Sequence, residues 1–238
     1  MNKLTLKFLS SAACAAALVL VGCATSSDSG SNGASKGPGS GFRATDGRNI
    51  DIGRSSTANG GRNFRNPRME KCWVAEGFNF NGYDTIYITP TESTAKFQND
   101  EARPHQIAKD RLPVELASYF KLTGVFPNVV TRESDIKPGA KVLRLSNTIT
   151  EYSKGGGAAR YFAGLYGAGQ PVLRVVGSTK DSGKEVFTYE MRCSGVSAGA
   201  RMTGAFRADE DIQIEDIRSL ALDLSDFVAA IAGKYQAR

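Results

Sequence analysis

Apolar and polar residues alternate along several short segments of the chain, which is typical of β-strands that bury one face. The clearest case is 185–193, where every second residue from Phe187 to Cys193 is apolar. The five residues before it, Lys180 to Lys184, contain Gly183 and predict a hairpin turn. Strands are expected at 72–78, 83–89, 128–131, 141–152, 170–179 and 185–193.

Two other segments have the spacing of helices. In 99–124 the apolar residues fall on one side, Gly124 is placed to end the helix, and Pro113 predicts a kink or two short helices. In 211–234 apolar residues recur every three or four positions and form one stripe, which favours packing on a sheet. Together these patterns predict an α+β fold, a mainly antiparallel sheet with two helical segments packed on one face.

The start of the chain has a different pattern. Lys3 and Lys7 precede an apolar run, 8–21, that is too short for a stable membrane span. The run ends in Leu20-Val21-Gly22-Cys23, which resembles the lipobox of bacterial lipoproteins. We therefore expect residues 1–22 to be a signal peptide and Cys23 to be lipidated. Acyl chains on Cys23 would then anchor the protein in a bilayer.

The segment after Cys23 is rich in serine, glycine and arginine and has few apolar residues. Such a composition does not bury enough surface to fold alone, so we expect a disordered, flexible tether over 23–68 and a single domain over 69–238. Arginines outnumber acidic residues in this tether. The tether is therefore either a plain solvated linker or a segment that makes a weak contact with peptidoglycan or anionic lipid. These arginines are Arg43, Arg48, Arg54, Arg62, Arg65 and Arg68.

Two cysteines, Cys72 and Cys193, remain in the expected domain. The strand phase places each on the apolar face of its strand, and paired thiols in an oxidising compartment favour a disulfide. The alternative is two small buried residues that never pair.

Two glycine-rich segments, 155–169 and 194–200, are unlike ordinary connections. If the strands before and after them are antiparallel, both segments leave the sheet at the same end. The first one carries apolar residues, and apolar residues in loops often mark a binding surface; close packing or simple flexibility would also explain the glycines. The candidate binding residues are Tyr161, Phe162, Leu165, Tyr166, Gly167 and Gly169.

Little in the sequence indicates catalysis. The dinucleotide-like Gly167-Ala168-Gly169 precedes a strand instead of following one. The only histidine, His105, is expected to be a surface or capping residue. No metal-ligand spacing and no nucleophile motif is present. We therefore expect no enzymatic activity, no catalytic residue, no cofactor, no metal and no nucleic-acid partner.

The combined motifs resemble a family of bacterial lipoproteins that carry a domain of unknown function. The motifs are Tyr83 to Pro90, Leu143 to Tyr152, the glycine-rich stretch and the terminal helix. The resemblance implies a membrane-tethered α/β domain in the periplasm and no catalytic residue. The residue after the cysteine is Ala24, and in this the chain resembles lipoproteins that are sorted to the outer membrane.

We therefore expect an outer-membrane lipoprotein whose domain faces the periplasm and binds an unidentified envelope protein. The alternative is self-assembly, in which glycine-rich loops from several copies pack together.

Overall fold

The computed structural model describes residues 41–44, 48–65, 69–156, 169–194 and 209–237. Its main element is a nine-stranded sheet in the order β3-β4-β5-β11-β10-β9-β6-β8, with β7 paired to β9. All neighbours are antiparallel except β6 with β8 and β9, and β7 with β9. The strands are β3 (Arg54–Ala58), β4 (Gly61–Arg65), β5 (Met69–Ala75), β6 (Thr85–Ile88), β7 (Glu92–Ser93), β8 (Asn128–Val130), β9 (Val142–Ser153), β10 (Val172–Asp181) and β11 (Lys184–Cys193).

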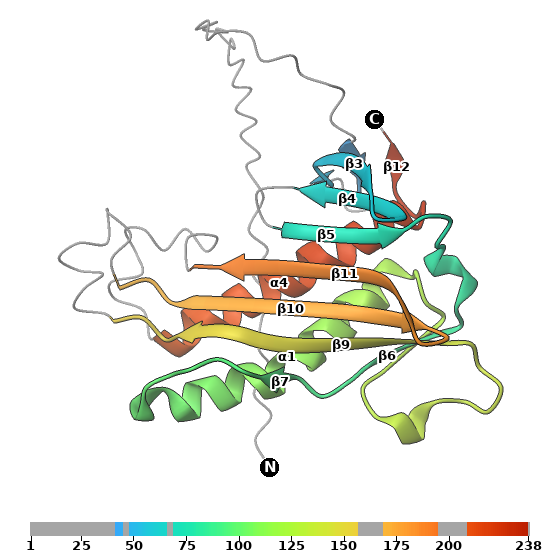
Figure 1. The fold of residues 1–238 in the computed structure, drawn as a ribbon. Helices are drawn as coiled ribbons and strands as arrows, with labels where there is room; N and C mark the ends of the chain where they lie inside the picture. Colours follow the sequence, from blue (N-terminus) through green and yellow to red (C-terminus); the bar gives the residue numbers. More distant parts are fainter. Residues whose placement is uncertain (1–40, 45–47, 66–68, 157–168, 195–208, 238) are drawn as a thin grey trace, which may run out of the picture. The chain divides into compact units, whose positions relative to one another are not determined.

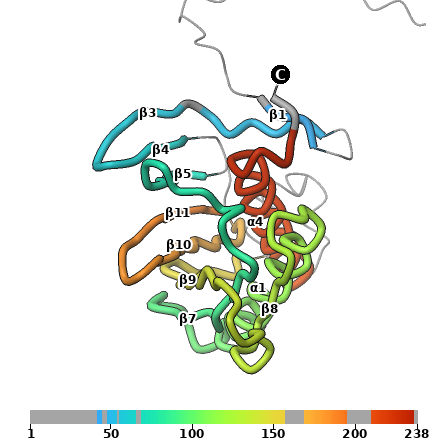
Figure 2. The backbone as a smooth tube through the Cα atoms, turned by 90° about the vertical axis from the view of Figure 1, so that its right-hand side faces the viewer, coloured from blue at the N-terminus to red at the C-terminus, as the bar shows by residue number. Residues whose placement is uncertain are grey.

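Two long helices, α1 (Ala102–Thr123) and α4 (Asp209–Ile231), pack on one face of this sheet (Figures 1 and 2). The predicted α+β class and the placement of both helices on one face are confirmed. Helix α1 is continuous through Pro113 and ends at Gly124, whose φ is 63°. In the described part of the chain, no helix is both long enough and apolar enough to cross a membrane.

The segment predicted as tether enters the fold from residue 41 onward, so that part of the prediction is wrong. Besides β3 and β4, it forms β1 (Gly41–Arg43) and β2 (Asn49–Asp51), which join β12 (Gln236–Ala237) in a second sheet of three strands. Two of its few apolar residues, Ile52 and Phe64, are buried in the main core. Arg48 is ion-paired to the buried Asp226 at 2.5 Å and so stabilises the fold.

The core lies between the helices and the inner face of β5, β11, β10 and β9. Tyr189 on β11 lies over Gly177 on β10, and its hydroxyl donates a hydrogen bond to Asn147 on β9. A Cβ atom at Gly177 would come within 3.0 Å of the Tyr189 ring, so only glycine fits there. This row of three residues joins three adjacent strands on the buried face.

Both predicted thiols face the core, but no disulfide joins them. The register places Cys72 opposite Tyr189, and Cys193 lies four residues further along β11. Four residues span about 13 Å of strand, whereas a disulfide requires Cα atoms within about 7 Å. The predicted disulfide is therefore wrong, although the predicted orientation of each thiol is confirmed. Burial raises the pKa of Cys72.

Candidate functional site

The ends of three strands meet at one end of the sheet, which we call the loop end. Ser153 at the end of β9 is paired with Val172 at the start of β10, and Leu173 is paired with Cys193 at the end of β11. The prediction that both glycine-rich segments start from this end is confirmed (Figure 1).

The helices also begin at the loop end. The Lys154 backbone N–H donates to Glu101, just before α1, and the Tyr152 hydroxyl donates to Gln213 in the first turns of α4, at 2.9 Å. Of the candidate binding residues, Gly169 is described, with a φ of 72°. The others, Tyr161, Phe162, Leu165, Tyr166 and Gly167, lie outside the described residues, as does most of 194–200.

The two sides of the first glycine-rich segment meet in a narrow neck. The Gly156 N–H donates a hydrogen bond to the Gly169 carbonyl at 2.9 Å. Gly155 has a φ of 76°, and a Cβ atom there would come within 3.0 Å of the backbone of Gly169, Gln170 and Pro171. At Gly155, glycine is therefore required by close packing of two backbones. Gly156 and Gly169, which flank segment 157–168, are therefore direct neighbours.

A buried carboxylate fastens this neck to α1. The Glu101 Oε1 atom accepts the Lys154 N–H at 2.8 Å, and its Oε2 atom accepts the Gln98 N–H at 2.8 Å. The Lys154 ammonium is also ion-paired to Asp100, and this hydrogen bond lowers the pKa of Asp100. The neck is thus held both by backbone contacts and by the residues that cap the start of α1.

The single histidine lies beside the neck, and the expectation of a surface or capping residue is wrong, because His105 is buried and lies within α1, whose N-cap is Glu101. His105 is only 5% exposed, its Nε2 atom lies 2.8 Å from Ser93 Oγ, and its ring stacks on Phe97 with centroids 4.2 Å apart. The Tyr152 ring meets it edge-on at 4.9 Å. Burial, with a contribution from Lys109, lowers the pKa of His105, although Glu101 opposes the shift.

Ser93 is held by the backbone around it as well as by His105. Its Oγ atom accepts the Ala95 N–H at 3.2 Å and lies 3.3 Å from the Ile149 carbonyl oxygen. A hydroxyl with these partners positions β7 against β9, which is a structural role for the Ser93–His105 contact. The sequence contained a signal for the burial of His105, because it stands three and seven residues before the buried Ala108 and Leu112.

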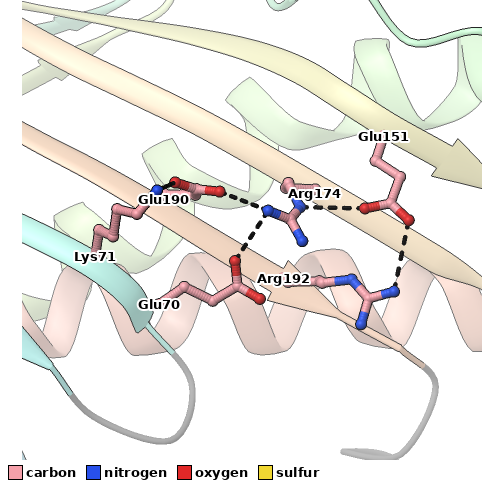
Figure 3. Close-up of polar contacts among 6 residues, drawn as sticks. All are labelled: Glu70, Lys71, Glu151, Arg174, Glu190 and Arg192. Carbon is pink, nitrogen blue, oxygen red and sulfur yellow. Dashed lines mark hydrogen bonds and ion pairs between the residues drawn. The ribbon is translucent and has the colours of Figure 1, made fainter.

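An ion-pair network covers the open face of the sheet at the loop end (Figure 3). Arg174 on β10 lies 3.1 Å from Glu70, 3.1 Å from Glu151 and 2.6 Å from Glu190. Lys71 pairs with Glu190 at 2.8 Å, and Arg192 pairs with Glu151 at 3.5 Å. Three cations thus balance three carboxylates across β5, β11, β10 and β9.

The network favours the ionised form of Glu190. The hydrogen bond from Lys71, and then that from Arg174, lowers the pKa of Glu190. The pKa of Arg174 is raised: burial alone would lower it, but the surrounding glutamates outweigh that effect. This surface therefore presents fixed charges of both signs, and sequence reasoning missed it because cross-strand partners depend on the strand order. Among the residues that the structure describes, no group of three or more His, Cys, Asp or Glu side chains could hold a metal ion.

No protein-family model and no curated protein sequence matches the chain. Among solved structures, it is similar to the PelC dodecamer from Paraburkholderia phytofirmans, with 14% sequence identity and a TM-score of 0.39, covering 59% of this chain and 88% of that chain. A variant PelC dodecamer from the same organism gives 13% identity and a TM-score of 0.39, with 65% and 94% covered. A TM-score this low supports no conclusion about function or assembly.

Proposed function

We propose that this protein is an outer-membrane lipoprotein whose α+β domain faces the periplasm and acts as a non-enzymatic binding module. The proposal includes membership of the lipoprotein family whose motifs it resembles. The anchor is supported by Leu20-Val21-Gly22-Cys23, which follows a basic start and a short apolar run.

We place the proposed binding surface at the loop end. The paired ends of β9, β10 and β11 bring the starts of two glycine-rich segments to one place, and the neck at Gly155 and Gly169 holds the first of them there. That segment contains Tyr161, Phe162 and Leu165. Apolar residues carried on a connection above a rigid scaffold are a common form of binding surface.

Crosslinking in cells tests this proposal. A photo-crosslinking residue at position 160 or 164 of the full, lipidated chain is expected to capture an envelope protein, identified by mass spectrometry. Combined Tyr161→Ser, Phe162→Ser and Leu165→Ser should abolish the crosslink. Combined Lys180→Ser and Lys184→Ser, at the opposite end of β10 and β11, is the matched control and should leave it intact.

Two results would replace this proposal. Unchanged crosslinks in the triple variant would show that another surface binds the partner. Crosslinks that join two copies of the chain through the same segment would favour loop-mediated self-assembly, the alternative function.

The anchor has its own test. Cys23→Ser should remove palmitate labelling and release the protein from the membrane fraction, while the same change at the buried Cys72 should leave labelling intact. Retention of Cys23→Ser in the membrane would contradict lipid anchoring. We also propose a weak contact between peptidoglycan and the arginines of the segment 23–68. Arg48 is left out of this contact, because it is ion-paired to Asp226.

A further inference from the structure

Helices α1 and α4 form a layer on the sheet, and the side of this layer that faces away from the sheet has a groove between the two helices. Helices α1 and α4 lie next to each other and both begin at the loop end, so they run in the same direction (Figure 1). Arg218 Nε lies 3.4 Å from Glu115 Oε1, which aligns the middle of the two helices. One turn further on, Tyr119 and Leu222 line the same depression.

A groove runs along the seam between the helices. It consists of two adjoining cavities of about 350 and 190 Å³, and both are lined by Tyr119 and Leu222. Two apolar side chains of α1 are open to solvent: Leu122, which lines the groove, is 79% exposed, and Val114 on the outer side of the helix is 52% exposed. Exposed large apolar side chains are a feature of protein-binding surfaces.

The two helices that form the groove carry opposite charge. Helix α1 has four basic residues and two acidic ones, whereas α4 has one basic residue and seven acidic ones. Arg103, Arg111 and Lys121 are exposed on α1, and Glu210 and Asp211 are exposed on α4. Asp216 and Asp226 of α4 are buried, and Arg218 is exposed at its middle. The charges that reach the surface are still mainly basic on α1 and mainly acidic on α4, the two helices that form the groove.

We propose that this face binds a second copy of the same chain, around a two-fold axis that runs parallel to the helices. Such an axis places α1 of each copy on α4 of the other. The more basic helix of each copy then lies against the more acidic helix of its partner, twice in one interface. An axis across the helices would instead place α1 on α1 and α4 on α4, with like charges opposed. Self-complementarity of this kind is what a two-fold interface requires.

The orientation has a consequence for the loop end. Because the axis runs along the helices, both copies point their loop ends in the same direction. A dimer would present two such ends side by side, which raises apparent affinity for a partner that has two matching sites. The interface itself does not depend on the proposed function, since it uses residues on a different face.

The state of association tests the interface. The full chain in detergent is expected to sediment as a concentration-dependent dimer. Leu122→Ser should raise the dissociation constant at least tenfold, and adding Val114→Ser should raise it further. Val176→Ser is the matched control, because Val176 is 38% exposed on the opposite, open face of the sheet, and it should leave the dimer unchanged.

Crosslinking with a carbodiimide, which joins lysine to carboxylate, tests the orientation. In a mixture of ¹⁵N-labelled and unlabelled copies, mixed-isotope crosslinks should join the α1 peptide that contains Lys121 to a peptide from α4. A monomer at every concentration, a dimer unaffected by Leu122→Ser, or mixed-isotope crosslinks confined to α1 with α1 would overturn the proposal. None of these results bears on the partner crosslinks of the loop end, so the two proposals fail separately.

Discussion

The two faces of the sheet formed by β5, β11, β10 and β9 hold polar groups in different ways. On the buried face a single row, Tyr189, Gly177 and Asn147, crosses three strands with one hydrogen bond and close ring packing. On the open face, six charged side chains form a network centred on Arg174 (Figure 3). The open face has more polar contacts, but water competes for each of them.

This difference determines where stability resides. A buried polar group that loses its partner incurs the full cost of desolvation, and a buried ring cannot move aside for an added methyl group. An exposed ion pair contributes little, because water and salt compensate when it is removed. We therefore expect the fold to depend on the buried row and to tolerate changes in the network.

The largest effect is expected at Gly177. Gly177→Ala would place a methyl group against the Tyr189 ring, which is held between the sheet and the helices. We expect a loss of about 3 kcal/mol in the free energy of unfolding and a fall in melting temperature of roughly 6 to 12 °C, measured by calorimetry. Gly156→Ala is the control, because a Cβ atom there meets open space. Equal melting temperatures for the two variants would contradict the packing argument.

A somewhat smaller effect is expected for the hydrogen bond in the same row. Tyr189→Phe removes the donor to Asn147 Oδ1, and among the described residues the Asn147 Nδ2 atom has no hydrogen-bond partner either. A buried amide group without hydrogen-bond partners should lower the free energy of unfolding by about 1 to 3 kcal/mol. Urea denaturation measures this loss.

A double-mutant cycle separates this bond from simple packing. Because removal of both polar partners is nearly neutral, Tyr189→Phe with Asn147→Leu should recover most of the lost stability. Strictly additive losses in the double variant would show that the hydrogen bond is not the cause.

Sequence patterns predicted much of the buried face and little of the open one. Burial repeats every two residues in strands and every three or four in helices, so it located β9 at Val142–Ser153 and α4 at Asp209–Ile231 to within a few residues. The same phase placed Cys72 and Cys193 toward the core. It could not show that Cys72 on β5 pairs with Tyr189, four residues away from Cys193 on β11, because phase determines a face and register determines a neighbour.

The remaining errors have the same origin. The ion-pair network depends on β10 lying between β9 and β11, and β5 lying beside β11, and one sequence does not contain that order. Residues 41–65 resemble a tether in composition, yet Ile52 and Phe64 suffice to fix short strands against a core that already exists. The neck depends on contacts between Gly155 and residues more than ten positions away, which composition alone does not predict.

A pH-dependent effect of intermediate size is expected at His105, which lies on the buried side between α1 and β9. Its pKa is lowered from 6.5 by burial, so near that pH the unfolded chain binds more protons than the folded one. Stability should therefore fall as the pH drops from 7 to 5. The pKa values of Asp100 and Glu190 are lowered from 3.8 and 4.5, so these groups contribute mainly at lower pH.

The measurement is the urea midpoint at pH 7, 6 and 5. His105→Gln has no group that titrates at this position, so its midpoint should change less with pH than that of the wild type. Parallel pH profiles for the two proteins would show that His105 stays neutral, or charges at no cost, over this range.

The smallest effect is expected at the centre of the open-face network. Arg174→Met removes three ion pairs at once, but it leaves Lys71 with Glu190 and Arg192 with Glu151, and the carboxylates that lose Arg174 can be hydrated. We expect a loss of about 0.5 to 1 kcal/mol in low salt, which shrinks toward zero in 1 M NaCl because exposed pairs are screened.

Arg132→Met is the control for an isolated pair, since Arg132 meets Asp135 on the exposed surface at 3.0 Å. If the network is only a sum of exposed pairs, the two variants should lose stability in proportion to the pairs removed and with the same dependence on salt. A loss above about 3 kcal/mol for Arg174→Met that is unchanged in 1 M NaCl would match the cost of breaking a buried pair. Stability would then reside on both faces of the sheet, and the distinction between them would fail.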